Sequence, residues 1–96
     1  MRRAARIDDN QKQIVGELRQ IPGCSVTSTA GVGKGFPDIV VGYQGINYLF
    51  EIKDPAKPPS ARKLTEHEHT FHEAWTGQVS IIHTTEEALE IMGIRI

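Results

Sequence analysis

Two short segments joined by a tight turn restrict most strongly which folds this chain can adopt. Residues 38–43 and 47–53 are rich in β-branched and aromatic residues, and the glycine-containing turn between them predicts a β-hairpin. Asp38 opens the first strand, and Glu51 follows it after twelve residues, late in the second strand. The hairpin therefore brings the two carboxylates close together. Because side chains alternate along a strand, Glu51 and Lys53 share one face at about 6–7 Å.

The segments around the hairpin predict an α/β domain with the element order α-β-β-β-α-β-α and a mixed sheet of about four strands. Helical periodicity, capping residues and glycine or proline stops place the helices, and runs rich in β-branched residues place the strands. The expected helices are residues 8–21, 65–75 and 84–92, and the further strands are residues 24–29 and 78–83.

Local patterns add detail to these elements. The first helix begins at Asp8 or Asp9, and capping boxes begin the other two helices. Phe71 and Trp75 are four residues apart, which predicts that they share the buried face of the second helix. The continuous apolar run 39–41 is typical of a strand covered on both faces.

Length and composition restrict the class of protein. With 96 residues, the chain fits a single domain, 1–96, and its one cysteine, Cys24, cannot form an internal disulfide. No apolar run approaches the roughly 18 residues of a membrane span, and the start does not resemble a signal peptide. We therefore expect an intracellular, cytoplasmic protein with no membrane partner.

The charge is nearly balanced but unevenly distributed. The 11 Lys and Arg residues against 12 Asp and Glu residues argue against a simple basic protein that coats nucleic acid. The basic residues nevertheless form local groups, which can present a positive face. These groups are Arg2, Arg3 and Arg6, and then Lys53, Lys57, Arg62 and Lys63.

The hairpin residues have the chemistry of a metal site. Two adjacent carboxylates repel each other, and a divalent cation such as Mg²⁺ removes that penalty. Asp38, Glu51 and the backbone carbonyl of Ile52 are the candidate ligands. Because a cation makes bound water more acidic, and Lys53 can orient water or offset negative charge on a phosphate, the set predicts phosphodiester hydrolysis.

These residues also resemble a known family. Residues 35–41, Gly-Phe-Pro-Asp-Ile-Val-Val, and residues 48–54, Tyr-Leu-Phe-Glu-Ile-Lys-Asp, resemble the core of the PD-(D/E)xK nucleases. More narrowly, the chain is similar to the stand-alone VRR-NUC domains of phages and bacteria, over about residues 7 to 93. The supporting matches are Asp8-Asp9-Asn10-Gln11, Lys34-Gly35, Lys63-Leu64-Thr65, Phe71-His72 and Trp75.

The resemblance implies a restriction-endonuclease-like fold and Mg²⁺- or Mn²⁺-dependent endonuclease cleavage of DNA. Stand-alone members resemble small Holliday-junction resolvases, which act as homodimers on branched DNA. Asp38 and Glu51 would hold the metal, and Lys53 would assist the nucleophile. The family commonly has a glutamate on the first helix; that position corresponds here to Gln11 or to Asp9, and a glutamine there favours a site with one metal.

Other features have weaker interpretations. Lys34, Lys57, Arg62 and Lys63 either contact the DNA backbone or lie in solvated loops. The glycine-rich loop before residue 36 lacks the Walker A spacing, so no nucleotide cofactor is expected. The histidines at 67, 69 and 72 do not share one helix face, which favours a solvated polar surface over zinc. Ile94 and Ile96 fit either a dimer interface or a last short strand.

Two alternatives to a junction nuclease stay open. One is a nicking or sequence-reading nuclease of the same fold. The other is a catalytically weak DNA-binding module, which the absence of a glutamate at position 11 suggests.

Overall fold

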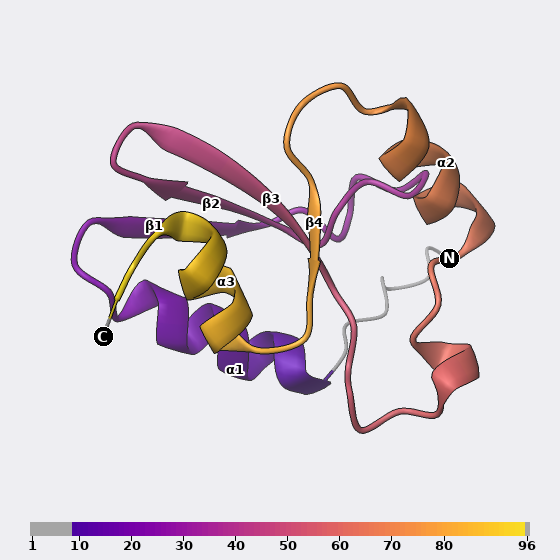
Figure 1. Ribbon diagram of the computed structural model, residues 1–96, viewed down its shortest axis with the longest axis horizontal. Helices are drawn as coiled ribbons and strands as arrows, with labels where there is room; N and C mark the ends of the chain where they lie inside the picture. Colours follow the sequence, from indigo (N-terminus) through magenta and orange to yellow (C-terminus); the bar gives the residue numbers. More distant parts are fainter. Residues whose placement is uncertain (1–8, 96) are drawn as a thin grey trace.

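The computed structural model describes residues 9–95 of the chain as a four-stranded mixed sheet with three α-helices (Figure 1). The predicted order of α-helices and strands is confirmed, and a 3-10 helix is an addition to it. The elements are α1 (Asp9–Arg19), β1 (Cys24–Ser28), β2 (Ile39–Tyr43), β3 (Ile46–Ile52), the 3-10 helix η1 (Pro59–Ala61), α2 (Glu66–Ala74), β4 (Ser80–Ile82) and α3 (Thr85–Met92).

The strands lie in the order β1-β2-β3-β4. The first three form an antiparallel meander, in which Ile39 of β2 pairs with Phe50 of β3. β4 is parallel to β3, and Glu51 pairs with Ile81. A parallel pair needs a crossover connection, and here the segment between β3 and β4 carries η1 and α2.

The hydrophobic core lies between one face of the sheet and the helices α1 and α3 (Figure 1). Leu18, Ile39, Phe50 and Ile82 are completely buried. Burying a side chain of this size contributes about 1.5–3 kcal/mol to stability, so this layer fixes the sheet and its two helices. The other core residues are Ile14, Val26, Val41, Ile52, Ala88, Leu89 and Met92.

Helix α2 lies beyond the end of the sheet, beside the loop that joins β1 to β2 (Figure 1). The prediction that Phe71 and Trp75 form a buried face is wrong: α2 has no buried residue, and Trp75 is 42% exposed. The two rings instead stack on each other with centroids 4.9 Å apart, and Phe36 of the loop packs against Phe71 edge-on at 5.3 Å. The aromatic residues thus attach α2 to the loop rather than to the main core.

The strands also differ in detail from the expectation. Val40 is only half-buried, so the sheet face opposite α1 and α3 is partly covered. β4 is shorter than the predicted strand, and its buried residue is Ile82, whereas Ile81 is 41% exposed. The predicted alternation of side chains along the strands is correct, but the sequence did not show which face of the sheet packs against the core.

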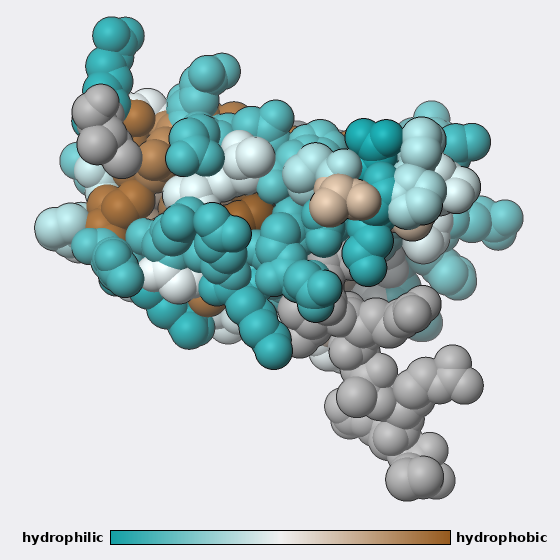
Figure 2. Space-filling view, turned by 90° about the horizontal axis from the view of Figure 1, so that it is seen from below, coloured by the Kyte–Doolittle hydropathy of each residue, from teal (hydrophilic) through white to brown (hydrophobic). Residues whose placement is uncertain are grey.

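The surface below the sheet is mostly hydrophilic, and its hydrophobic residues gather at one end (left in Figure 2). A pocket beside the end of α3 is lined in part by Leu89, Gly93 and Ile94. Ile94 packs against the core, while Ile96 lies outside the described residues. The arginines predicted to present a positive face, Arg2, Arg3 and Arg6, also lie outside the described residues, as does Asp8, a candidate for the start of the first helix. Within residues 9–95, every helix is too short or too polar to cross a membrane.

Candidate active site

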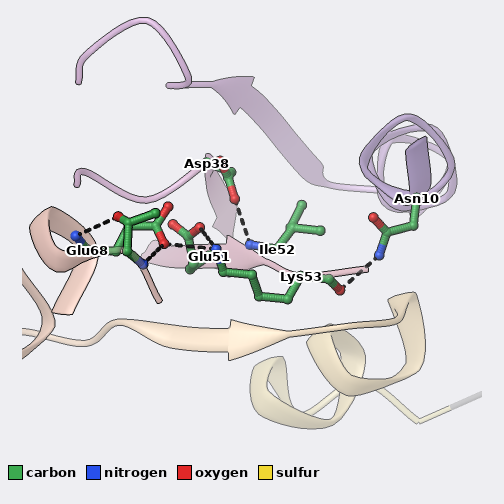
Figure 3. Close-up of polar contacts among 7 residues, drawn as sticks. Asn10, Asp38, Glu51, Ile52, Lys53 and Glu68 are labelled. Carbon is green, nitrogen blue, oxygen red and sulfur yellow. Dashed lines mark hydrogen bonds and ion pairs between the residues drawn. The ribbon is translucent and has the colours of Figure 1, made fainter. Parts of the chain in front are cut away.

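The β2–β3 hairpin fixes Asp38 at the start of β2. The backbone N–H of Asp38 donates to the carbonyl of Phe50 at 3.0 Å, and Asp38 Oδ2 accepts a hydrogen bond from the backbone N–H of Ile52 at 2.7 Å (Figure 3). The carboxylate is therefore oriented by the strand that carries Glu51. The predicted proximity of the two acidic residues across the hairpin is present in the structure.

Glu51 lies on the face of β3 opposite the core residues Phe50 and Ile52, and Lys53 follows directly after the strand. The Glu51 side chain is only 2% exposed, and its Oε2 atom is 3.5 Å from Lys53 Nζ. Its other oxygen, Oε1, is buried and has no hydrogen-bond partner within the described chain. A buried carboxylate oxygen without a donor is costly, which marks this position as one where a missing partner would bind.

Glu68 of α2 completes the group, and sequence analysis missed its part in it. Its Oε1 atom accepts a hydrogen bond from Lys53 Nζ at 2.8 Å (Figure 3). The sequence identified Glu68 only as the capping-box partner of Thr65, a role that the structure confirms. The link to Lys53 has no sequence signal, because it depends on how the segment between β3 and α2 returns to the sheet.

The surroundings of the two hairpin carboxyls disfavour their charged forms. Burial raises the pKa of Glu51 to about 9, and the neighbouring charge of Asp38 acts in the same direction. Burial also raises the pKa of Asp38, although the Ile52 N–H partly opposes it. Without a cation beside it, Glu51 therefore keeps its proton at neutral pH.

Lys53 is held in its charged form. Burial alone would lower the pKa of Lys53, but the hydrogen bond to Glu68 and the charges of Glu68 and Glu51 outweigh burial and raise it. The pKa of Glu68 is lowered: burial raises it, but the hydrogen bonds from Lys53 and from the Thr65 backbone more than compensate. The site thus places a charged ammonium group beside Asp38 and Glu51. This single positive charge does not offset the burial that raises the pKa of both carboxyl groups.

A divalent cation fits the donor set of this site. The candidate ligands, two carboxylates and the Ile52 carbonyl, are the oxygen donors that Mg²⁺ and Mn²⁺ prefer, and one of the carboxylate oxygens, Glu51 Oε1, is buried without a partner among the described residues. Residues 9–95 contain no group of three or more Asp, Glu, His or Cys side chains that could hold a metal. Water would therefore complete the coordination, as is usual for Mg²⁺.

The first helix reaches this region through Asn10. Asn10 Nδ2 donates to the carbonyl oxygens of Lys53 and His83, both at 3.1 Å, and so links α1 to the ends of β3 and β4. Gln11, the predicted site residue, is 4% exposed and lies on the buried face of α1 with Ile14. Asp9 is exposed. No pattern in the sequence indicates the Asn10 contacts.

The residues predicted to contact DNA lie on exposed loops. Lys34 is in the loop between β1 and β2, while Lys57, Arg62 and Lys63 are in the segment after β3. The first loop is held against α2 at Gly35, which has a φ of +81° and where a Cβ atom would lie 2.2 Å from the His67 carbonyl oxygen. Only glycine fits this approach.

His72 lies one helical turn beyond Glu68 on α2. Burial lowers the pKa of its imidazole, and the charge of Lys53 acts in the same direction against the opposing charge of Glu68. The Nε2 atom is buried without a partner among the described residues. His72 therefore borders the site in its neutral form.

Comparison with models of protein families, with curated proteins and with solved structures finds no match to this chain.

Proposed function

We propose that this protein is a metal-dependent DNA endonuclease with a PD-(D/E)xK core. The observation that carries the proposal is the group formed at the end of the hairpin. Asp38 is oriented toward β3 by the Ile52 N–H at 2.7 Å. Glu51 Oε2 lies 3.5 Å from the Lys53 ammonium, and Glu51 Oε1 is buried without a partner among the described residues. Two carboxylates can hold a divalent cation and one ammonium can stabilise a charged transition state, and these are the groups that hydrolysis of a phosphodiester uses.

Each residue has a distinct part in this chemistry. Asp38, Glu51 and the Ile52 carbonyl would hold Mg²⁺ or Mn²⁺, which supplies a more acidic water and charge neutralisation when bound. The Ile52 N–H fixes the orientation of Asp38. Lys53, kept charged by Glu68, offsets the negative charge that develops on the phosphate in the transition state. Lys34, Lys57, Arg62 and Lys63 are exposed and available to contact the DNA backbone.

The proposed substrate is branched DNA, such as a four-way junction, cut by a homodimer. One site cuts one strand, and symmetric cutting of a junction needs two sites related by a two-fold axis. No predicted helix presents a row of Arg, Asn or Gln residues for reading base edges, which favours recognition of DNA shape. A strict monomer at micromolar concentration in analytical ultracentrifugation would contradict the dimer.

Cleavage of a labelled four-way junction and of the matching linear duplex tests the proposal. Wild type and Lys53→Ala are compared in Mg²⁺, Mn²⁺ and EDTA. We expect cutting of the junction in either metal, none in EDTA, and a loss of at least about 100-fold in the variant, as for removal of one group that stabilises transition-state charge. Equal cutting of both DNAs favours a nicking or sequence-reading nuclease. Binding of the DNAs in a gel shift without cutting favours the DNA-binding module.

A further inference from the structure

Lys53 lies between two carboxylates at unequal distances. Its Nζ atom is 2.8 Å from Glu68 Oε1 and 3.5 Å from Glu51 Oε2. The first distance is that of a strong, charge-assisted hydrogen bond, whereas the second is longer than an ordinary hydrogen bond. Glu68 is therefore the main partner of the ammonium group, and the contact with Glu51 Oε2 is the weaker of the two.

The Glu68 side chain is itself fixed in place. The same Oε1 atom accepts the backbone N–H of Thr65 at 2.9 Å, while the Thr65 hydroxyl accepts the backbone N–H of Glu68 at 3.2 Å. This reciprocal capping box holds the carboxylate at the first turn of α2. Lys53 thus binds to an anchored acceptor rather than to a mobile surface residue.

The position of the ammonium group matters because of Glu51. The Glu51 side chain is 2% exposed, and of its oxygens Oε2 faces Lys53 while Oε1 has no partner within the described residues. If Glu68 lost its charge, Glu51 would be the stronger acceptor within reach of Lys53. The ammonium would then close on Glu51 and compete with a cation for that carboxylate.

We propose that Glu68 is a positioning residue, which holds the Lys53 ammonium away from Glu51 and so keeps the Glu51 carboxylate available to a divalent cation. This inference rests on the proposed function, because it assigns Glu51 to cation binding. Glu68 acts only through Lys53. It does not contact the reacting atoms.

The test measures binding of Mn²⁺ to the full chain by titration calorimetry, without DNA. Glu68→Gln removes the charge but keeps the capping box, which accepts glutamine at this position. We expect its Kd for Mn²⁺ to rise about 10-fold, as is typical when a residue that orients a ligand is lost. Glu66→Gln makes the same change in net charge on an exposed residue, and Thr65→Ala weakens the cap but keeps the Glu68 carboxylate. Both controls should stay within about twofold of wild type.

A second pair of variants separates positioning from a direct effect of charge. In a Lys53→Met background there is no ammonium to hold, so adding Glu68→Gln should leave the Kd for Mn²⁺ unchanged. An equal loss of affinity in both backgrounds would overturn the proposal, because Glu68 would then act on the cation without Lys53. Loss of affinity in Glu66→Gln as large as in Glu68→Gln would overturn it as well.

The results also distinguish this inference from the proposed function. Wild type that binds Mn²⁺ with the same Kd as Glu68→Gln refutes the positioning role and leaves the nuclease proposal intact. Wild type that binds no Mn²⁺ at millimolar concentration refutes the metal-dependent nuclease and the inference together.

Discussion

Two regions of the molecule are stabilised in different ways. The sheet, α1 and α3 enclose eleven buried hydrophobic residues, whereas α2 has none. Helix α2 is attached instead by three aromatic rings, a glycine contact and the Lys53–Glu68 ion pair. Asp38 and Glu51 belong to the first region and Glu68 to the second. The candidate site therefore spans a rigid part of the molecule and a part that can open at lower free energy.

The largest expected difference between the regions concerns two phenylalanines. Phe50→Ala should lower the free energy of unfolding by about 3–5 kcal/mol, because it leaves a cavity at a fully buried position. Phe71→Ala should cost about 1 kcal/mol, since its ring is only half-buried. Urea denaturation measures both values. Equal losses would show that α2 belongs to the same cooperative unit as the sheet.

The next largest expected effect is a pH dependence of the free energy of unfolding, which arises from Glu51 in the rigid region. The pKa of Glu51 is raised from 4.5 to about 9 in the folded protein. The contribution of Glu51 to the free energy of unfolding is therefore fully present below about pH 4.5 and is lost progressively as the pH rises toward 9. In EDTA, we expect the free energy of unfolding of wild type to fall between pH 5 and pH 8.

Glu51→Gln should flatten this profile and raise stability at pH 8, because the amide carries no charge at either pH. Glu66→Gln, which changes an exposed residue of α2, should keep the slope of wild type. Chemical denaturation at a series of pH values measures the profiles. A slope that is unchanged in Glu51→Gln would show that another group causes it.

A smaller and more local effect is expected at the contact between the first loop and α2. Gly35 and Gly33 have nearly the same φ, +81° and +82°, but a Cβ atom at Gly35 would overlap the His67 backbone, whereas at Gly33 it meets open space. Both alanine variants incur the cost of a left-handed backbone, about 1–2 kcal/mol. Only Gly35→Ala should also detach α2.

Hydrogen exchange of the amides in α2 measures this detachment directly. We expect faster exchange in Gly35→Ala than in Gly33→Ala, with the amides of β2 and β3 protected equally in both. Equal exchange of α2 in the two variants would mean that the glycine contact does not hold the helix.

The same contrast explains what the sequence could predict. Helix caps, strand composition and the hairpin turn are local signals, and they placed the α-helices and strands of the described chain in the right order, although they did not predict the 3-10 helix η1. The proximity of Asp38 and Glu51 was also predictable, because a short turn determines it. The burial of Trp75 was predicted wrongly, because spacing on a helix says which residues share a face and not what covers that face.

The contacts that sequence analysis missed are long-range. Glu68 reaches Lys53 across 15 positions, and Asn10 reaches the carbonyl of Lys53 across 43. Both depend on how separate elements pack, which no local pattern encodes. The capping box already accounts for a glutamate at position 68. The sequence therefore offers no reason to look for a second role of Glu68, its bond to Lys53.

The Lys53–Glu68 bond also closes a loop. It joins the end of β3 to the first turn of α2, and every residue from Pro55 to Lys63 between them is exposed. One end is fixed further by the hydrogen bond from Lys53 N to Ile82 O, at 3.0 Å, and the other by the capping box. Because each doubling of a flexible loop costs only about 0.6 kcal/mol, this segment can lengthen without moving the site. Insertions here would add surface beside the candidate site while Asp38, Glu51 and Lys53 stay in place.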